Sequence, residues 1–180
     1  GINLPQLDAV VDAALAMKNV ELIGLHFHIG SQIRETEPFI MLCEKASELL
    51  QHLEARGVKL SIINVGGGLG INYDDPDGDA IAGFDQYFGI FKQHLKLREG
   101  QELHFELGRD VVAQCGSLTT RVTYVKTGIV KKFIIVDAGM SDLIRPALYQ
   151  AHHKIENISA TGTPTETYDV VGPICESSDC

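Results

Sequence analysis

The spacing of apolar residues alternates between a helical and a strand pattern over the first hundred residues. Apolar positions three and four apart predict three helices, over residues 4–15, 37–56 and 84–97. Shorter apolar runs predict three strands: VELIGLHFHIGS at 20–31, KLSIINVGGGLGI at 59–71 and QELHFELGR at 101–109. Helices and strands that alternate in this order are typical of a parallel sheet or a β/α barrel.

The pattern changes from Val111 onward. The runs VVAQCGSLTTRVTYVKT, IVKKFIIVDAG and YDVVGPICES are rich in β-branched residues, and no helical pattern of useful length separates them. Such runs favour an antiparallel β region, so we place a domain boundary near residue 111. Three β/α units cannot close an eight-stranded barrel, and we therefore expect the chain to be an interior piece of a longer protein.

Charge and composition argue against several classes of protein. The 180 residues carry a formal net charge of −9 without a cluster of Lys and Arg, which argues against a nucleic-acid partner. No apolar stretch approaches the roughly 20 residues of a membrane span, and the start of the chain lacks a signal-peptide pattern. The four cysteines, at 43, 115, 175 and 180, are too scattered for a disulfide framework and include no C-x-x-C zinc pair. We therefore expect a cytoplasmic protein with free thiols.

Glycines follow two of the predicted strands, where the active site of a β/α barrel gathers. Gly66, Gly67 and Gly68 come directly after the second strand, so the backbone can approach an anion closely and present N–H groups to it. A plain tight turn would use the same glycines. With Gly108 after the third strand, the pattern favours a phosphate cradle.

Glu106 lies at the end of an apolar strand, where a carboxylate is costly without a partner. It could form a structural ion pair with Arg109, or it could face a ring nitrogen of a bound cofactor and keep that nitrogen protonated. His26 and His28 lie two apart on a strand and face the same way. Together with His104 they leave open a rival hypothesis, a zinc hydrolase of the amidohydrolase type.

Polar residues also gather in the segment DAGMSDLIRPALYQAHH at 137–153. Arg145 and Tyr149 lie four apart, so one turn of helix would direct both side chains to one place. Arg is suited to binding a carboxylate through two hydrogen bonds, although a surface turn with an ordinary Tyr would fit the same letters.

Read in chain order, HFHIGSQ, NVGGGLGI, FELGR, DAGMSDLIRPALY and GPICESSD closely resemble the diaminopimelate decarboxylase family. This family belongs to the alanine-racemase-like, fold type III decarboxylases that use pyridoxal 5′-phosphate. The likeness runs from Gly1 to Asp179. It implies that residues 1–110 are the C-terminal portion of a TIM-type (β/α)8 barrel that binds the cofactor, and that residues 111–180 are part of a C-terminal antiparallel β domain.

The resemblance also implies an activity and an assembly. The family, a group of lyases, decarboxylates meso-2,6-diaminopimelate to L-lysine and CO₂, the last step of lysine biosynthesis, and works as a homodimer that shares active sites across its interface. Decarboxylation of another basic amino acid, such as arginine or ornithine, is a close alternative. A non-catalytic homologue that binds a partner is an alternative from another class.

The resemblance implies cofactor contacts, position by position. His28 would stack on the ring of the cofactor, and Glu106 would meet its pyridine nitrogen. Ser31, Gly68 and Gly108 would help to hold its phosphate, so the cradle inferred from the glycines is the family's phosphate site.

The substrate contacts follow in the same way. Arg109, Arg145 and Tyr149 would bind the substrate at its carboxylate end, with Arg109 close to the cofactor as well. Glu176 would bind a substrate ammonium group. Cys175 would reach into the active site of the other subunit and donate a proton there.

Two features depart from the family. Leu107 stands where the family usually has proline in Glu-Pro-Gly-Arg, which loosens the backbone at this point. The lysine that forms the Schiff base belongs to an early barrel strand, and no lysine of this chain matches it. We therefore expect the chain by itself to be inactive.

The tail GPICESSDC raises the question of what Cys175 does. An extended run would separate the Cα atoms of Cys175 and Cys180 by roughly 16 Å, too far for a disulfide. The charges of Glu176 and Asp179 should disfavour the thiolate of Cys175. A protonated thiol suits a proton donor better than a nucleophile, whereas Cys180 has no role that we can infer.

Overall fold

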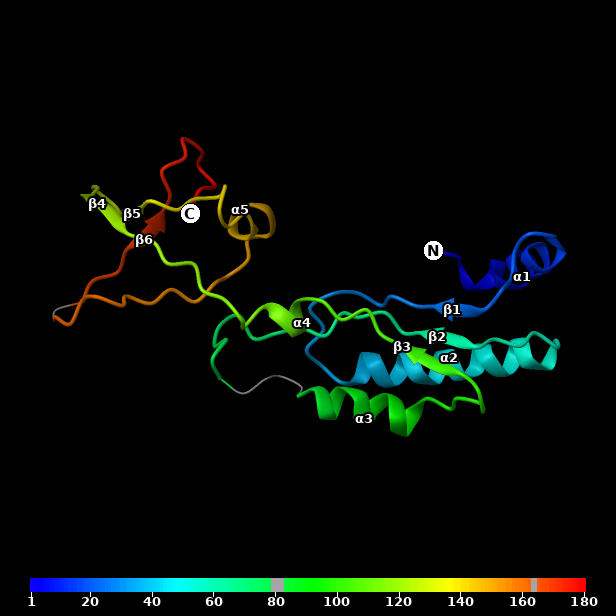
Figure 1. Cartoon of the computed structure of the whole chain (residues 1–180). Coiled ribbons are helices and arrows are strands. Elements are labelled where there is room, and N and C mark those ends of the chain that lie inside the picture. Colours follow the sequence, from blue (N-terminus) through cyan, green and yellow to red (C-terminus); the bar gives the residue numbers. More distant parts are fainter. Residues whose placement is uncertain (79–82, 163–164) are drawn as a thin grey trace. The chain divides into compact units, whose positions relative to one another are not determined.

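The computed structural model describes residues 1–78, 83–162 and 165–180, and its contacts divide the chain into two compact units. The first unit consists of Gly1–Ile71 and Ala80–Ala113. The second consists of Asn72–Asp79 and Gln114–Cys180. The alternating helices and strands belong to the first unit, and the later strands belong to the second (Figure 1).

The first unit follows the helix–strand order that the apolar pattern predicts. Its elements are η1 (Leu4–Gln6), α1 (Leu7–Ala16), β1 (Gly24–His26), α2 (Glu37–Ala55), β2 (Ile62–Asn64), α3 (Phe84–His94), β3 (Glu102–His104) and α4 (Arg109–Val112). The three strands are parallel, in the order β1-β2-β3, and His26, Asn64 and His104 share one register position. A parallel β/α arrangement is confirmed, but these described strands form an open sheet of three and no barrel.

The strands are shorter than the apolar runs that predicted them, because only three residues of each run make the full ladder. Single hydrogen bonds continue the pairing beyond the strand ends. Val65 N–H donates to the His104 carbonyl at 3.0 Å, and Glu106 N–H donates to the Gly66 carbonyl at 2.7 Å. These bonds keep the segments that follow β2 and β3 side by side as far as Glu106.

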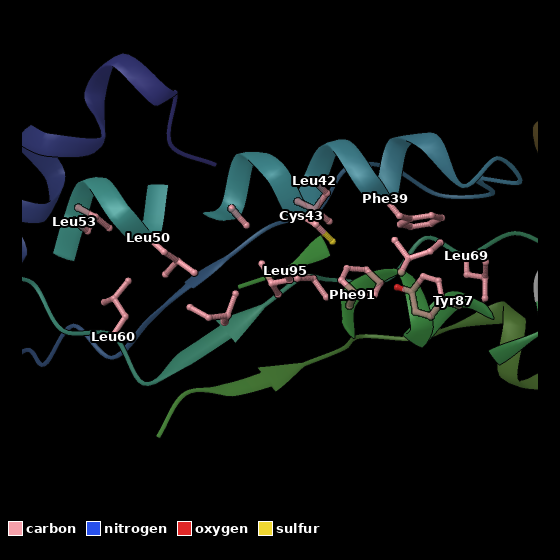
Figure 2. Packing of buried hydrophobic residues seen from close by; sticks show 14 of the residues in the cluster. Phe39, Leu42, Cys43, Leu50, Leu53, Leu60, Leu69, Tyr87, Phe91 and Leu95 are labelled. Atoms are coloured by element: carbon pink, nitrogen blue, oxygen red, sulfur yellow. The ribbon is translucent and has the colours of Figure 1, made fainter. Parts of the chain in front are cut away.

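An apolar core forms where α2 and α3 pack on each other and on the strand segments (Figure 2). The ring of Tyr87 on α3 lies edge-on to Phe39 on α2 and to Phe91, with centroids 5.1 Å away in each case. Phe105, after β3, meets Phe91 in the same way at 5.0 Å. Each such pair adds roughly 0.5–1.5 kcal/mol beyond the burial of apolar area, so this aromatic group stabilises the packing of both helices.

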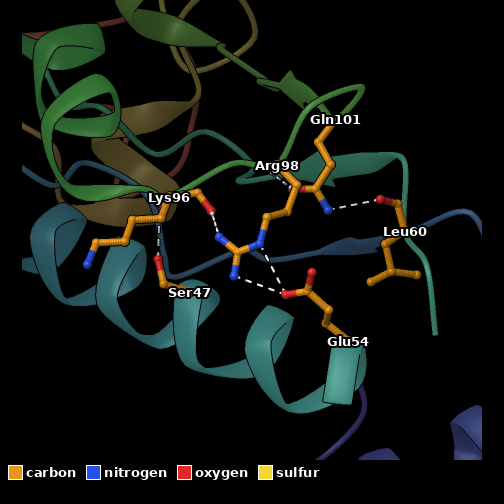
Figure 3. A network of polar contacts seen from close by, with 6 residues as sticks. All are labelled: Ser47, Glu54, Leu60, Lys96, Arg98 and Gln101. Carbon is orange, nitrogen blue, oxygen red and sulfur yellow. Dashed lines mark hydrogen bonds and ion pairs between the residues drawn. The ribbon is translucent and has the colours of Figure 1, made fainter. Parts of the chain in front are cut away.

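Polar contacts fix the connection between α3 and β3 against the C-terminal part of α2 (Figure 3). The Arg98 guanidinium donates two hydrogen bonds to Glu54 Oε2, at 3.1 and 3.0 Å. The Gln101 side chain accepts from the Arg98 N–H at 2.8 Å and donates to the Leu60 carbonyl at 2.9 Å. The start of β3 is therefore held in place before the strand runs towards Glu106.

The second unit contains a three-stranded sheet and a short helix: β4 (Val122–Thr127), β5 (Lys132–Val136), α5 (Arg145–Tyr149) and β6 (Asp169–Val171). The strand order is β4-β5-β6. None of the helices in the described ranges of the chain is both long enough and apolar enough to cross a membrane.

The expectation of an antiparallel β region is only half right. β4 and β5 are antiparallel and are joined by a tight turn in which Gly128 N–H donates to the Lys131 carbonyl at 2.9 Å. β5 and β6 are parallel. A long connection that contains α5 returns the chain to the starting end of the sheet, and parallel pairing needs such a crossover.

Candidate active site

Glu106 connects the ends of all three parallel strands. Its Oε1 accepts a hydrogen bond from Asn64 Nδ2 at 3.0 Å, and its Oε2 lies 3.2 Å from His26 Nε2. Asn64 ends β2, His26 ends β1, and Glu106 follows β3 by two residues. The side chains of His26 and Glu106 are each about half exposed, at 55% and 53%, so their pairing contributes little to stability and leaves the carboxylate within reach of a ligand.

The three glycines after β2 let the neighbouring strand ends approach closely. A Cβ atom at Gly67 would lie 2.0 Å from the Glu106 carbonyl oxygen, and one at Gly68 would lie 2.2 Å from the Gly30 carbonyl oxygen. Gly66 has φ +73° and Gly68 has φ +102°. Any side chain here would push the strand ends apart. Close packing of the strand ends therefore requires glycine at these positions, whether or not an anion binds.

His28 lies beside this glycine turn. A Cβ atom on Gly66 would come within 3.3 Å of His28 Nδ1. The Gly66 N–H donates to Asn64 Oδ1 at 2.9 Å, so Asn64 binds the turn with one side of its amide and Glu106 with the other. The structure thus brings His28, the glycine turn and Glu106 to the carboxyl ends of the parallel strands.

Gly108 precedes α4, and its N–H donates to Asp110 Oδ1 at 2.9 Å. Asp110 Oδ2 is buried and has no hydrogen-bond partner within the described part of the chain. Two N–H groups of the predicted phosphate cradle, those of Gly66 and Gly108, therefore already bind side-chain oxygens of this chain.

Arg109 begins α4 and contacts the segment that follows β1. Its Nη1 donates to Gln32 Oε1 at 3.1 Å. Gln32, next to Ser31, also donates from Nε2 to the Ile71 carbonyl at 2.6 Å, and its own φ is +61°. Gln32 therefore ties Arg109 and the chain around Ser31 to the end of the glycine segment.

In the second unit, Arg145 and Tyr149 form the predicted single turn of helix, α5. The Arg145 guanidinium lies over the Tyr73 ring, 4.5 Å from its centroid, and Nη1 donates to the Tyr73 hydroxyl. The other edge of this small cluster is His153, whose ring lies 5.2 Å from that of Tyr73. Tyr149 is 67% exposed. The cluster fixes Arg145, while Tyr149 remains open to solvent.

The tail segment carries Cys175 and Glu176 on an exposed loop, and neither Cys175 nor Cys180 is in a disulfide. Glu176 Oε1 accepts from Ser177 N–H at 2.9 Å. Asp179, whose charge is expected to disfavour the thiolate of Cys175, is 5% exposed, and its carboxylate accepts hydrogen bonds from backbone N–H groups.

Several residues of these arrangements were not identified from the sequence: Asn64, Gln32, Tyr73 and Asp110. Asn64 had a signal, since it takes the same position in its strand as His26 and His104 in theirs. For the zinc hypothesis, no group of three or more His, Cys, Asp or Glu side chains within 1–78, 83–162 and 165–180 could hold a metal ion.

The predicted site residues thus form two groups. The cofactor residues and Arg109 lie in the first unit, and Arg145, Tyr149, Cys175 and Glu176 lie in the second.

Known proteins are similar to the chain over nearly its whole length. Diaminopimelate decarboxylase from Bacteroides thetaiotaomicron is 60% identical over 179 residues, which cover 99% of this chain and 46% of the relative. The crystal structure of diaminopimelate decarboxylase from Helicobacter pylori, complexed with L-lysine, matches with a TM-score of 0.84 and 39% identity, over 99% of this chain and 43% of that one. A crystal structure of a protein from Aquifex aeolicus matches with a TM-score of 0.86 and 35% identity, over 99% and 43%. The chain therefore spans a little under half the length of these relatives.

The family model of the pyridoxal-dependent decarboxylase C-terminal sheet domain matches residues 9–180. This match extends over both units and includes every residue of the two groups. It confirms the family resemblance read from the five motifs, and the chain belongs to the pyridoxal-dependent decarboxylases.

Proposed function

We propose that this chain supplies cofactor and substrate contacts to an enzyme that decarboxylates meso-diaminopimelate to L-lysine. The observation that carries the proposal is the Glu106 carboxylate, held by Asn64 and His26 at the ends of three parallel strands, in a chain 60% identical to a diaminopimelate decarboxylase. In this proposal residues 1–110 are the last part of a TIM-type barrel, and residues 111–180 are part of a C-terminal β domain. The enzyme is a cytoplasmic homodimer.

The residues at the strand ends fit pyridoxal phosphate at its ring. Glu106 offers a carboxylate to the pyridine nitrogen, and Asn64 and His26 keep it at the sheet edge. His28 supplies an aromatic face beside the glycine turn. When bound, the cofactor supplies an electron sink for the electron pair left by the departing CO₂.

The glycine turns also fit the phosphate group of the cofactor, provided that one hydrogen bond within the chain is exchanged. Ser31, Gly68 and Gly108 remain our proposed phosphate contacts, and Gly66 and Gly67 complete the turn. The Gly108 N–H donates to Asp110, so phosphate binding there requires an exchange of that hydrogen bond. Removing Asp110 is therefore a direct test of the cradle.

In this proposal the site residues of the second unit bind the substrate and donate the proton. Arg145, fixed over Tyr73, binds a carboxylate together with Tyr149, and Arg109 lies near the cofactor end. Glu176 binds an ammonium group. The C–CO₂ bond breaks, its electron pair stays with the former α-carbon, and Cys175 donates the thiol proton that forms the new C–H bond. The thiol then regains its proton from solvent.

The experiment uses the full-length protein that contains this chain, with lysine and CO₂ formation as readouts. Loss of a positioned general acid lowers rates by about 10²–10⁴-fold, so Cys175→Ala should lower kcat by at least about 10²-fold. The visible absorbance of bound cofactor should stay at the wild-type level. Loss of the cofactor in this variant, or unchanged turnover, would overturn the role of Cys175.

Shared active sites make a separate test available. Cys175→Ala and Glu106→Gln protomers would each be nearly inactive alone. Mixed in equal amounts, they should recover about a quarter of wild-type activity, because half of the dimers are mixed and each of those has one intact site. No recovery, in a mixture shown to exchange subunits, would mean that each site is built from one chain.

A further inference from the structure

The buried carboxylate of Asp179 has no function in the mechanism above. Asp179 is 5% exposed, and no ion pair found in the described part of the chain includes it. A buried carboxylate costs free energy unless hydrogen bonds replace its lost hydration. The hydrogen bonds of this group therefore indicate what it holds.

Both carboxylate oxygens accept from the backbone of different segments. Oδ1 accepts from Met140 N–H at 2.5 Å, and Oδ2 accepts from Ile174 N–H at 2.7 Å. The Asp179 main chain adds two more bonds: its carbonyl accepts from Gly172 N–H at 2.9 Å, and its N–H donates to the Glu176 carbonyl at 3.1 Å. One residue thus joins the loop after β5, the loop after β6 and the tail.

The Asp179 carboxylate packs closely against two glycines, where any side chain would clash with it. A Cβ atom on Gly172 would lie 2.3 Å from Oδ2, and one on Gly139 would lie 2.8 Å from Oδ1. Both glycines are therefore needed for the carboxylate to reach its two N–H donors.

These bonds close the loop that carries the predicted proton donor. The loop runs from Ile174, bound by the carboxylate, to Asp179 itself, and Cys175 and Glu176 lie between these ends. Inside it, Glu176 N–H donates to the Ile174 carbonyl at 2.8 Å. The backbone on both sides of Cys175 and Glu176 is therefore tied to Asp179.

We propose that Asp179 is a positioning residue, which holds Cys175 and Glu176 for proton donation and ammonium binding by fixing the loop 174–179 on the loop 138–142. This inference rests on the proposed function. The competing explanation is that Asp179 only stabilises the second unit. The two differ in whether its effect on the rate acts through Cys175.

A double-mutant cycle in the full-length protein separates them. Asp179→Asn keeps the shape but replaces one acceptor oxygen by an NH₂ group, which would face a backbone N–H. We expect kcat to fall about 10-fold or more, because small displacements of positioned groups have large effects on rate. In a Cys175→Ala background the same change should lower kcat less than about twofold, since there is no donor left to misplace. Asp169→Asn, which removes an exposed carboxylate paired with Lys131 in the same unit, should leave kcat unchanged.

The outcomes distinguish this inference from the proposed function. An equal loss from Asp179→Asn in both backgrounds, or no loss at all, would overturn the positioning role and leave the proposed function standing. If Cys175→Ala alone turns over like wild type, the proposed function of Cys175 fails first. If Asp179→Asn does not fold, Gly139→Ala takes its place in the cycle, because it pushes on the carboxylate without removing it.

Discussion

In the first unit the buried side chains are apolar and come mostly from α2, α3 and the segments around β2, whereas in the described part of the second unit only Val136 and Asp179 are buried. The first unit is thus stabilised mainly by burial of apolar area. In the second unit, hydrogen bonds between side chains and the backbone join the loops, as at Asp179, whose carboxylate accepts from two backbone N–H groups. A change of one polar atom should therefore have local consequences in the second unit, and a loss of apolar volume should have larger ones in the first.

The largest effect is expected from Phe91→Ala. Phe91 is 1% exposed and contacts three aromatic rings, so its removal should destabilise the first unit by about 3–5 kcal/mol. Cys43 reports on this unit, because it is fully buried and burial raises the pKa of its thiol to about 11. Alkylation of Cys43 in the full-length protein should become at least about 100-fold faster.

Phe84→Ala is the matched control for this change. Phe84 lies on the same helix but is 42% exposed and stacks only on Phe88 among the rings of the described residues. It should alter Cys43 alkylation by less than about tenfold. Equal rates in the two variants would show that the aromatic core does not hold the first unit together.

The next effect is on chemistry, at the polar edge of the first unit. Glu106→Gln keeps a hydrogen-bonding group near the cofactor ring but removes the negative charge, so kcat should fall about 100-fold. Glu102→Gln is the control on the same strand, where the carboxylate pairs with His104 and is 72% exposed. It should change kcat less than twofold. Steady-state kinetics of both variants would show whether the edge of the sheet acts separately from its core.

The same contrast explains what could be predicted from the sequence. The periodicity of α2 and α3 and the apolar runs of β1 to β3 come from burial, and hydropathy records burial directly. The parallel pairing of β6 was missed because β-branched residues favour strands without specifying direction. The direction of β6 is set by the long connection before it, and the sequence shows only the length of that connection.

The site was predicted unevenly for a similar reason. Glycines, a strand-end carboxylate and an Arg–Tyr pair stand out by residue type and spacing. Gln32 and Asp179 do not, because their roles depend on backbone N–H and carbonyl groups that come from distant parts of the chain. Asp179, four residues after Cys175, suggested only a charge in the sequence, and its hydrogen bonds to the backbone of Met140 and Ile174 had no signal there.

A smaller effect is expected from Asp110→Ala, which changes one polar contact in the first unit. The variant removes a negative charge and releases the Gly108 N–H. If that N–H binds the cofactor phosphate, affinity should rise about fivefold, since two charges a few Å apart in water interact by about 1 kcal/mol. Equilibrium titration of the apoenzyme with pyridoxal phosphate measures this. Asp85→Ala, a first-turn carboxylate on α3, is the control and should leave affinity unchanged.

Affinity that falls in Asp110→Ala would argue that Asp110 holds the turn for the phosphate instead of competing with it. Affinity that stays the same would remove Gly108 from the cradle. Asp110 also acts on the aromatic core, since burial and then the charge of Asp110 raise the pKa of Tyr87 to about 12. Cys43 alkylation in the same variant would therefore show whether the core has changed along with cofactor binding.

The smallest effect is a pH dependence of the second unit. Burial, followed by the positive charge of Arg145 and by His152, lowers the pKa of His153 below its usual 6.5. The unfolded chain therefore binds a proton more readily than the folded one, so stability is present above about pH 6.5 and is lost as the pH falls towards the folded value. Amide exchange in residues 145–154, corrected for its intrinsic pH dependence, should show less protection at pH 5.5 than at pH 7.5. His153→Gln should abolish this difference, whereas His152→Gln, at the exposed neighbouring residue, should retain most of it. If His153→Gln kept the full difference, protonation of His153 would not be the cause of the pH dependence. The polar contacts of the Tyr73–Arg145–His153 cluster would then respond to pH as little as the apolar core of the first unit does.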